Sequence, residues 1–186
     1  ENTLEGSIPE SLKNLENLNW LSLYTNKLSG NLPEWLGEIS SPQLLLLGGN
    51  QFNGPIPESL GNLQNLLALG LSDNDLAGEI PNNIERLKNL IYLFLNDNSF
   101  SGSIPSELGN LNSLVYLSLK SNFLEGPIPL ELFNLSNLTH LELDRNRFDG
   151  KIPSQISNLK QLISLSLFQN LLSGTIPAAI SQLPNL

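Results

Sequence analysis

Asparagine recurs every 24 residues along the whole chain, without an insertion or a deletion. Glycine follows each asparagine four residues later, and proline follows three residues after that glycine. A fixed period of this length predicts a stack of similar coils, because one unit cannot bury its own apolar face and must cover it with its neighbours. The periodic asparagines are Asn2, Asn26, Asn50, Asn74, Asn98, Asn122, Asn146 and Asn170.

Written as one unit, the period is LxxLxLxxNxLxGxIPxxLxxLxx, which is clearest between Leu114 and Ser136. The LxxLxLxxNxL part is typical of any leucine-rich repeat, and the inserted LxGxIP segment resembles the plant-specific form of that family. The resemblance covers the whole chain. It implies an α/β solenoid, a right-handed superhelix with a parallel β-sheet on its concave side and short helical or 3₁₀ segments on its convex side. Residues 1–186 would form a single leucine-rich repeat domain of about seven to eight repeats.

The residue types of the unit explain how such a coil holds together. In the LxL segment, a period of two places Leu117 and Leu119 on the core side of a short strand. The asparagine is expected to be buried and to satisfy backbone groups where the chain turns, which forms a ladder across the stack. The large apolar residue after it alternates between leucine and phenylalanine, and these side chains should interdigitate between coils. The glycine permits a positive φ or a close backbone approach.

Two features depart from the repeat. Pro42 stands where the other complete repeats have leucine, and its missing N–H should distort the coil just before the expected strand 45–47. The chain also begins one residue before Asn2 and stops at a core leucine, Leu186, without a recognisable cap. Since solenoids need capping units for solubility, we expect a piece of a longer protein.

Composition excludes several function classes. The net charge of −9 disfavours nucleic acid, because it repels phosphate backbones. The absence of cysteine and the single histidine leave little for a disulfide framework, a metal site or nucleophilic catalysis. No run of apolar residues is long enough to span a membrane, so we expect no direct membrane contact from this segment. We therefore expect no enzyme, no metal and no cofactor.

Exposed strand positions are where repeats can differ without harm to the core, so they are the candidate ligand-binding positions. Apolar and aromatic residues gather there although stability does not require them, which favours a partner. Small residues between them predict a shallow groove with aromatic walls, suited to a peptide or a sugar chain. The alternative is that the aromatic side chains only pack on each other across strands. The apolar candidates are Trp20, Tyr24, Leu44, Leu46, Tyr92, Phe94 and Tyr116, and the small residues are Gly48, Gly49, Ala68 and Gly70.

Acidic residues on the same face are the second group of candidates. Asp73 and Asp97 are neighbours in one column, and Glu142 and Asp144 share a face near His140. Either pair could orient a cation or a basic ligand segment. The alternative is that these carboxylates form ordinary surface ion pairs, with Lys120 and Arg145 as partners for the second pair. His140 lacks a positioned nucleophile, since Ser118 is expected to be a surface hydroxyl.

Two N-glycosylation sequons begin at Asn134 and Asn137 and fall on the expected convex side. A glycan there would not obstruct the concave face. Because asparagine recurs at both positions in other repeats, these sequons can also arise by accident of the repeat.

By resemblance, the most similar proteins are the ectodomains of plant leucine-rich repeat receptor-like kinases and receptor-like proteins. Such a chain would bind a peptide or protein ligand, and possibly a co-receptor, at the cell surface or outside the cell. Receptors that grip a peptide carboxylate use paired arginines, but Arg145 and Arg147 straddle a ladder asparagine, so that role is not assigned here. The alternatives are a polygalacturonase-inhibitor-like defence protein, an ice-binding or purely scaffolding solenoid, and an intracellular or engineered repeat array.

Overall fold

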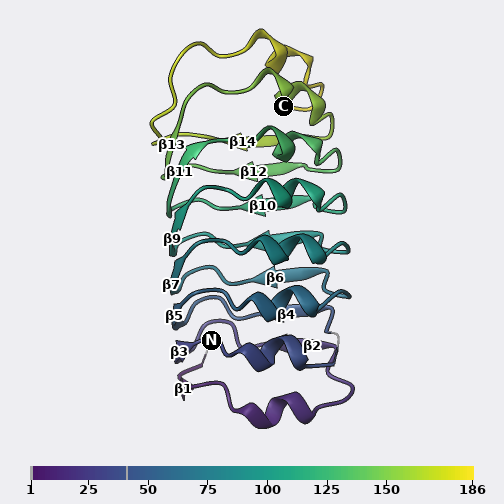
Figure 1. Ribbon diagram of the computed structural model, residues 1–186, viewed down its shortest axis with the longest axis vertical. Coiled ribbons are helices and arrows are strands. Elements are labelled where there is room, and N and C mark those ends of the chain that lie inside the picture. The colour runs from purple at the N-terminus through teal and green to yellow at the C-terminus, as the bar shows by residue number, and fades with distance from the viewer. Residues whose placement is uncertain (1, 41) are drawn as a thin grey trace.

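The computed structural model describes residues 2–40 and 42–186, which wind into one continuous stack of coils (Figure 1). In chain order, a full coil contributes one short strand to a front sheet, one short strand to a side sheet and then one 3₁₀ helix. The front sheet contains β2 (Trp20–Ser22), β4 (Leu44–Leu46), β6 (Ala68–Gly70), β8 (Tyr92–Phe94), β10 (Tyr116–Ser118), β12 (His140–Glu142) and β14 (Ser164–Ser166). The side sheet contains β1 (Glu5–Gly6), β3 (Lys27–Asn31), β5 (Gln51–Gly54), β7 (Asp75–Gly78), β9 (Ser99–Gly102), β11 (Phe123–Pro127) and β13 (Arg147–Asp149). The 3₁₀ helices are η1 (Glu10–Asn14), η2 (Glu34–Glu38), η3 (Glu58–Asn62), η4 (Asn82–Arg86), η5 (Ser106–Asn110), η6 (Leu130–Asn134), η7 (Ser154–Asn158) and η8 (Ala178–Gln182).

Every strand of the front sheet pairs in parallel with the strand one period away. Leu117 lies opposite Leu93 on one side and Leu141 on the other, and all three are buried. The neighbouring residues on each strand point to the opposite face. The parallel sheet expected from the LxL segment is therefore confirmed, and equivalent positions of successive repeats form straight columns on its outer face.

The side sheet was not predicted from the sequence. From β3 to β13, each of its strands holds only one buried side chain, as β11 does with Leu124 between the exposed Phe123 and Glu125. Such a short pattern indicates no strand, and the pairing arises because stacked coils bring equivalent segments side by side. The expected alternation of leucine and phenylalanine in the core is present: Phe100 and Phe148 are fully buried on either side of Leu124.

The ladder of asparagines is confirmed and joins successive coils. The side-chain amide of Asn122 donates to the carbonyl oxygens of Leu119 at 3.1 Å, in its own coil, and of Leu95 at 3.0 Å, in the preceding one. Its carbonyl oxygen accepts a hydrogen bond from the N–H of Phe100 at 3.0 Å. Asn122 is 6% exposed. Its two carbonyl acceptors also accept from neighbouring ladder asparagines, Leu119 from Asn146 at 2.9 Å and Leu95 from Asn98 at 3.2 Å, so each carbonyl is shared by two asparagines.

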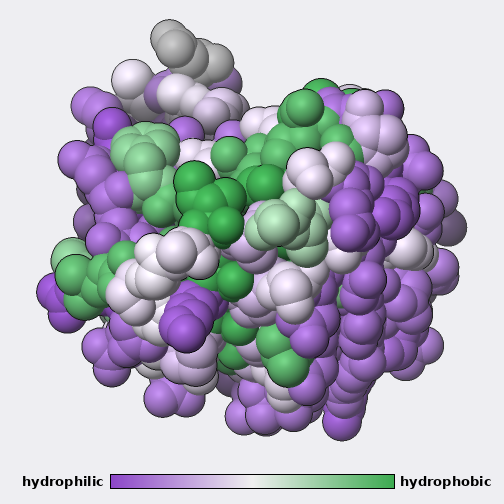
Figure 2. Space-filling model, turned by 90° about the horizontal axis from the view of Figure 1, so that it is seen from above, coloured by the Kyte–Doolittle hydropathy of each residue, from purple (hydrophilic) through white to green (hydrophobic). Residues whose placement is uncertain are grey.

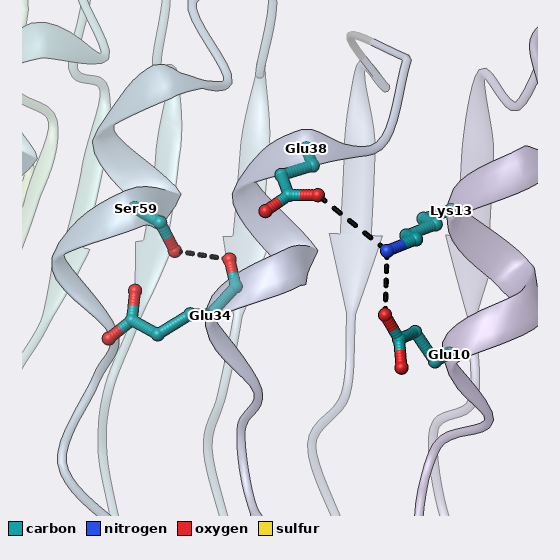
Figure 3. Close-up of polar contacts among 5 residues, drawn as sticks. All are labelled: Glu10, Lys13, Glu34, Glu38 and Ser59. Atoms are coloured by element: carbon teal, nitrogen blue, oxygen red, sulfur yellow. Dashed lines mark hydrogen bonds and ion pairs between the residues drawn. The ribbon is translucent and has the colours of Figure 1, made fainter.

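The 3₁₀ helices stack closely on the side of the coils opposite the front sheet (Figure 1). Each begins after the repeat proline, which holds an extended conformation at the cap. A Cβ atom on Gly61 would lie 2.5 Å from the carbonyl oxygen of Asn83 in the next coil, so this position tolerates only glycine. Figure 3 shows polar contacts between these helices: Ser59 donates to the carbonyl oxygen of Glu34 at 2.6 Å.

Pro42 changes the end of its coil, as expected from its missing N–H. In the coil of η3, Leu63 has a ψ of 61° and its N–H donates to the carbonyl oxygen of Leu60. The equivalent residue of the coil that contains Pro42, Ile39, is extended with a ψ of 146°. The effect stays local, because β4 still pairs in register with β2 and β6. Ser41 lies outside the described residues.

Apolar side chains of the core reach solvent at the C-terminal end of the stack. Figure 2 looks down on this end and shows apolar side chains gathered across it, with polar side chains around them. Ile176 is 73% exposed, whereas the equivalent Ile104 and Ile128 of earlier coils are 3% exposed. The last coil thus offers an uncovered surface like those that neighbouring coils cover elsewhere.

We expect Asn122→Ala to lower the free energy of unfolding by about 1–3 kcal/mol, because the buried N–H of Phe100 loses its Asn122 acceptor and a buried polar group left unsatisfied costs about this much. Chemical denaturation followed by circular dichroism measures this change. Asn112→Ala is the matched control, because Asn112 is exposed and should shift stability by less than about 0.5 kcal/mol. Equal effects of the two substitutions would show that the ladder contributes nothing specific.

Candidate functional site

The outer face of the front sheet carries a hollow of about 490 Å³. It runs across the coils of β2 to β12, so its walls come from residues far apart in the sequence. Apolar rings, a leucine, two carboxylates and one ammonium group share its surface. The lining residues are Tyr24, Leu46, Gly70, Ser72, Asp73, Phe94, Asn96, Tyr116, Lys120 and Glu142.

Four rings form a continuous row across β8, β10 and β12. The ring centroids of Tyr92 and Phe94 are 6.3 Å apart, and those of Phe94 and Tyr116 are 5.1 Å apart. The imidazole of His140 stacks on Tyr116 at 4.8 Å with an interplanar angle of 8°. The mutual packing considered as an alternative is therefore real here. It also fixes the rings that border the hollow, so Phe94 and Tyr116 present a rigid apolar wall.

The expected floor of small residues is partly covered. A Cβ atom on Gly48 would lie 2.9 Å from the Tyr24 ring, and one on Gly70 would lie 3.0 Å from a methyl group of Leu46. Tyr24 and Leu46 thus lean over the glycines, and of the four small residues only Gly70 lines the hollow. The glycines matter because they let these two larger side chains lie down on the sheet.

Glu142 is held in place by two donors from the neighbouring strand β10. The Tyr116 hydroxyl donates to its Oε1 at 2.8 Å, and the Ser118 hydroxyl donates to its Oε2 at 2.7 Å. Ser118 is 1% exposed, so its expected role as a surface hydroxyl was wrong. The direction of its side chain, toward the Glu142 carboxylate, was not apparent from the sequence. Burial, together with the hydrogen bond to Glu142, raises the pKa of Tyr116 to about 12.

The ion pairs expected around Asp144 do not form. In the described part of the chain, the two ion pairs both involve Lys13, with Glu10 and Glu38 (Figure 3). Arg145 instead lies over the ring of Phe168 at 5.5 Å and donates to Gln169 at 3.1 Å. Asp144 is 4% exposed, which is unusual for a carboxylate without a cationic partner.

Asp73 and Asp97 have a structural reason to be where they are. Both adopt positive φ, 53° and 54°, a conformation in which aspartate and asparagine are enriched. Every member of this column does the same, whatever its side chain. Asp97 accepts a hydrogen bond from the Asn96 side chain at 2.7 Å and does not line the hollow, whereas Asp73 does. The column is Thr25, Gly49, Asp73, Asp97, Ser121, Arg145 and Gln169.

The structure brings together only part of the predicted set. Tyr24, Leu46, Asp73, Phe94, Tyr116 and Glu142 line one hollow. Trp20, Leu44, Tyr92, Asp97, His140 and Asp144 lie outside it. Three lining residues were not singled out beforehand, namely Ser72, Asn96 and Lys120. All three occupy the outward column next to the positive-φ residues, and this shared position is the sequence signal that identifies them.

Both sequons lie on or beside the 3₁₀ side of the stack. Asn134 is the last residue of η6 and is exposed. Asn137 is exposed too, and its amide donates to the carbonyl oxygen of Asn112 at 2.8 Å. Neither residue is near the hollow, which the opposite side of the coil carries.

Across residues 2–40 and 42–186, His, Asp and Glu do not form a group of three or more that could hold a metal ion. Over the same residues, none of the helices has the length and apolarity needed to cross a bilayer.

One protein-family model and many solved structures resemble this chain. The Leucine Rich Repeat model matches six stretches, residues 17–39, 41–63, 89–111, 113–135, 137–159 and 161–183. A crystal structure of a TDR receptor matches with a TM-score of 0.97 at 37% sequence identity. The match covers 99% of this chain and 32% of the receptor chain. No curated protein sequence matches.

Two further structures differ in what they bind. The Arabidopsis receptor kinase HAESA, in complex with the peptide hormone IDA and the co-receptor SERK1, matches with a TM-score of 0.95 at 38% identity, over 99% of this chain and 31% of its own. A plant ice-binding protein matches with a TM-score of 0.85 at 28% identity, over 97% of this chain and 58% of its own. The chain thus spans about a third of the length of the two receptors.

We expect the Tyr116 phenol to stay protonated in the folded protein until the pH approaches about 12. Because this pKa lies above the ordinary value of 10.0, its contribution to stability is complete below pH 10.0 and is lost as the pH rises through about 12. NMR of protein labelled at the tyrosine ring carbons follows this titration, with Tyr116→Phe to assign the signal. Glu142→Gln should lower the Tyr116 pKa only in part, since burial, the larger cause, remains. A Tyr116 signal that titrates at its ordinary pH would contradict the geometry.

Proposed function

This chain belongs to the plant-type leucine-rich repeat family, and from that premise we propose that it is a recognition module that binds a peptide or protein segment in the hollow of the front sheet. The observation that carries the proposal is the hollow itself. Rigid rings, an oriented carboxylate and an ammonium group line an open surface where the fold requires none of them. An extended peptide could lie across the columns and contact several coils at once.

The exposed aromatic residues support a protein or peptide as the ligand. Trp20 is 64% exposed and Tyr24 is 53% exposed, and neither contributes to the core. Aromatic side chains are enriched at interfaces because they bury a large area at a small cost in conformational entropy. Trp20 and Tyr92 lie outside the hollow, so they would extend the contact beyond it.

The likeness to HAESA supports both the ligand class and the setting. That receptor was crystallised with a peptide hormone and a co-receptor, and its sequence is 38% identical over the matched region. By analogy, this chain would act outside the cell as part of a longer receptor, with a co-receptor as a second partner. The proposal assigns no catalytic step, because the hollow is open to solvent and offers no preorganised site that excludes water.

The ice-binding relative marks the main alternative within the same fold. Ice recognition requires a flat and regular array of similar groups, whereas the front columns of this chain mix rings, carboxylates, glycines and a lysine. A polygalacturonase-inhibitor-like role would use the same face on a protein ligand, and a peptide selection separates it from the proposal.

We expect Phe94→Ala to weaken binding of peptides selected from a random display library on the 186-residue chain by about 10-fold or more, because central aromatic side chains often dominate an interface. Isothermal titration calorimetry with synthetic peptides measures the change. Phe123→Ala is the matched control, since Phe123 is 46% exposed on the side sheet, away from the hollow. Selected peptides that bind both variants equally well would place the binding surface elsewhere.

We expect the protein secreted from plant cells to carry glycan at Asn134, Asn137 or both. Both side chains are exposed, and a glycan on the 3₁₀ side leaves the front sheet free. Both sites lie on one tryptic peptide, residues 121–145, and mass spectrometry of that peptide before and after enzymatic removal of N-glycans detects sugar on it. Asn134→Gln and Asn137→Gln, separately, assign the occupied residue. Secreted protein without sugar at either position would remove this support for an extracellular setting.

A further inference from the structure

We infer that Glu142 binds a basic side chain of the peptide and thereby sets the position of the peptide in the hollow, an inference that rests on the proposed function. Its starting point is the fixed orientation of this carboxylate. Tyr116 and Ser118 each donate to one oxygen, at 2.8 Å and 2.7 Å. A carboxylate held in this way needs no reorganisation to receive a cation, so it loses little entropy on binding.

The Glu142 carboxylate still has free acceptor capacity. Its two oxygens together can accept about four hydrogen bonds, and two are used. Within residues 2–40 and 42–186 no lysine or arginine forms an ion pair with it, although Lys120 lines the same hollow. Asp144, two residues further on the same face, is 4% exposed and also unpaired with a cation in the described chain. Of these two carboxylates, Glu142 is the one available to a cation from outside, because it lines the hollow and Asp144 is buried outside it.

The surroundings of Glu142 suit a basic side chain better than a simple cation. The rings of Phe94 and Tyr116, 5.1 Å apart, give an apolar wall for the methylene groups of arginine or lysine. A cation near an aromatic face gains further attraction, and partial exclusion of water strengthens its pairing with a carboxylate. A metal ion would require more oxygen ligands than this place offers, in line with the absence of a metal-binding group from the described residues.

The charge of the protein favours the same partner. Two carboxylates, Asp73 and Glu142, and one ammonium group, Lys120, line the hollow, so its side chains are negative in sum. The whole chain carries a net charge of −9. A negative field attracts a basic peptide over a long range and disfavours an acidic one. Lys120 would help to fix the position of the peptide along the hollow, because it repels a second basic residue of the peptide next to the one bound by Glu142.

A peptide selection followed by a double-mutant cycle tests the inference. Peptides enriched from a random display library on the 186-residue chain are synthesised in two forms, the original and one with each basic residue in turn replaced by norleucine. Calorimetry then measures both forms on the unchanged protein and on Glu142→Gln. We expect Glu142→Gln to weaken binding by about 10- to 100-fold, as for loss of a charge-assisted hydrogen bond. We expect no further loss once the contacting basic residue is norleucine.

Glu131→Gln is the matched control, since it removes the same charge from exposed η6, on the other side of the coil. It should change binding less than about two-fold, because an exposed distant charge is screened. Ser118→Ala tests the positioning role of a buried hydroxyl that does not line the hollow. Ser118→Ala should weaken binding of the original peptide by about 3- to 10-fold and leave binding of the norleucine form unchanged. A merely structural effect would weaken both forms alike.

The outcomes separate the inference from the proposed function. Peptides that depend on Phe94 but bind Glu142→Gln as well as the unchanged protein overturn the inference and leave the proposed function standing. Additive losses in the cycle overturn it too, because the basic residue then contacts something else. A selection that enriches no peptide at all overturns both. Thermal unfolding of each variant confirms that the comparison is made between folded proteins.

Discussion

The hydrogen bonds of the buried asparagines hold this solenoid in register. From Asn50 to Asn170, each ladder asparagine donates to carbonyl groups of its own coil and of the preceding one, as Asn122 does to Leu119 and Leu95. Because the groups it serves are the backbone of two coils, a shift of one coil would leave several buried polar groups unpaired at once. The period of 24 residues is thus a structural requirement, and the leucines of the core stack as a consequence.

This register creates the front face. Residues one period apart lie opposite each other on adjacent strands, so Ser118 faces Glu142 and Tyr116 faces both Tyr92 and His140. The core positions must repeat, but the outward positions are free to vary from coil to coil. A binding surface can therefore be assembled from single substitutions in separate repeats without loss of core packing. The hollow is the product of several such differences in neighbouring coils.

The outward columns of the sequence predict where the candidate site lies but not the contacts within it. Tyr24, Phe94, Tyr116 and Glu142 were expected on the face of the hollow because strand periodicity decides which way a side chain points. The buried hydroxyl of Ser118 was misjudged, since its burial comes from neighbours on other coils. Asp144 was a candidate for ligand binding with a surface ion pair as the alternative, and the ion pair does not form, because Arg145 contacts Phe168 instead. Such choices depend on rotamers and neighbours that a linear pattern does not encode.

The sequence by itself determined the period, the family, the front sheet, the asparagine ladder and the position of the outward columns, because each follows from which residue types repeat and at what spacing. Only the tertiary structure decided the side sheet, the row of rings from Tyr92 to His140 and the orientation of Glu142. These features depend on the distance and angle at which one coil rests on the next. That geometry is a property of the packed stack, in which each residue meets partners one period away, and no single repeat contains it.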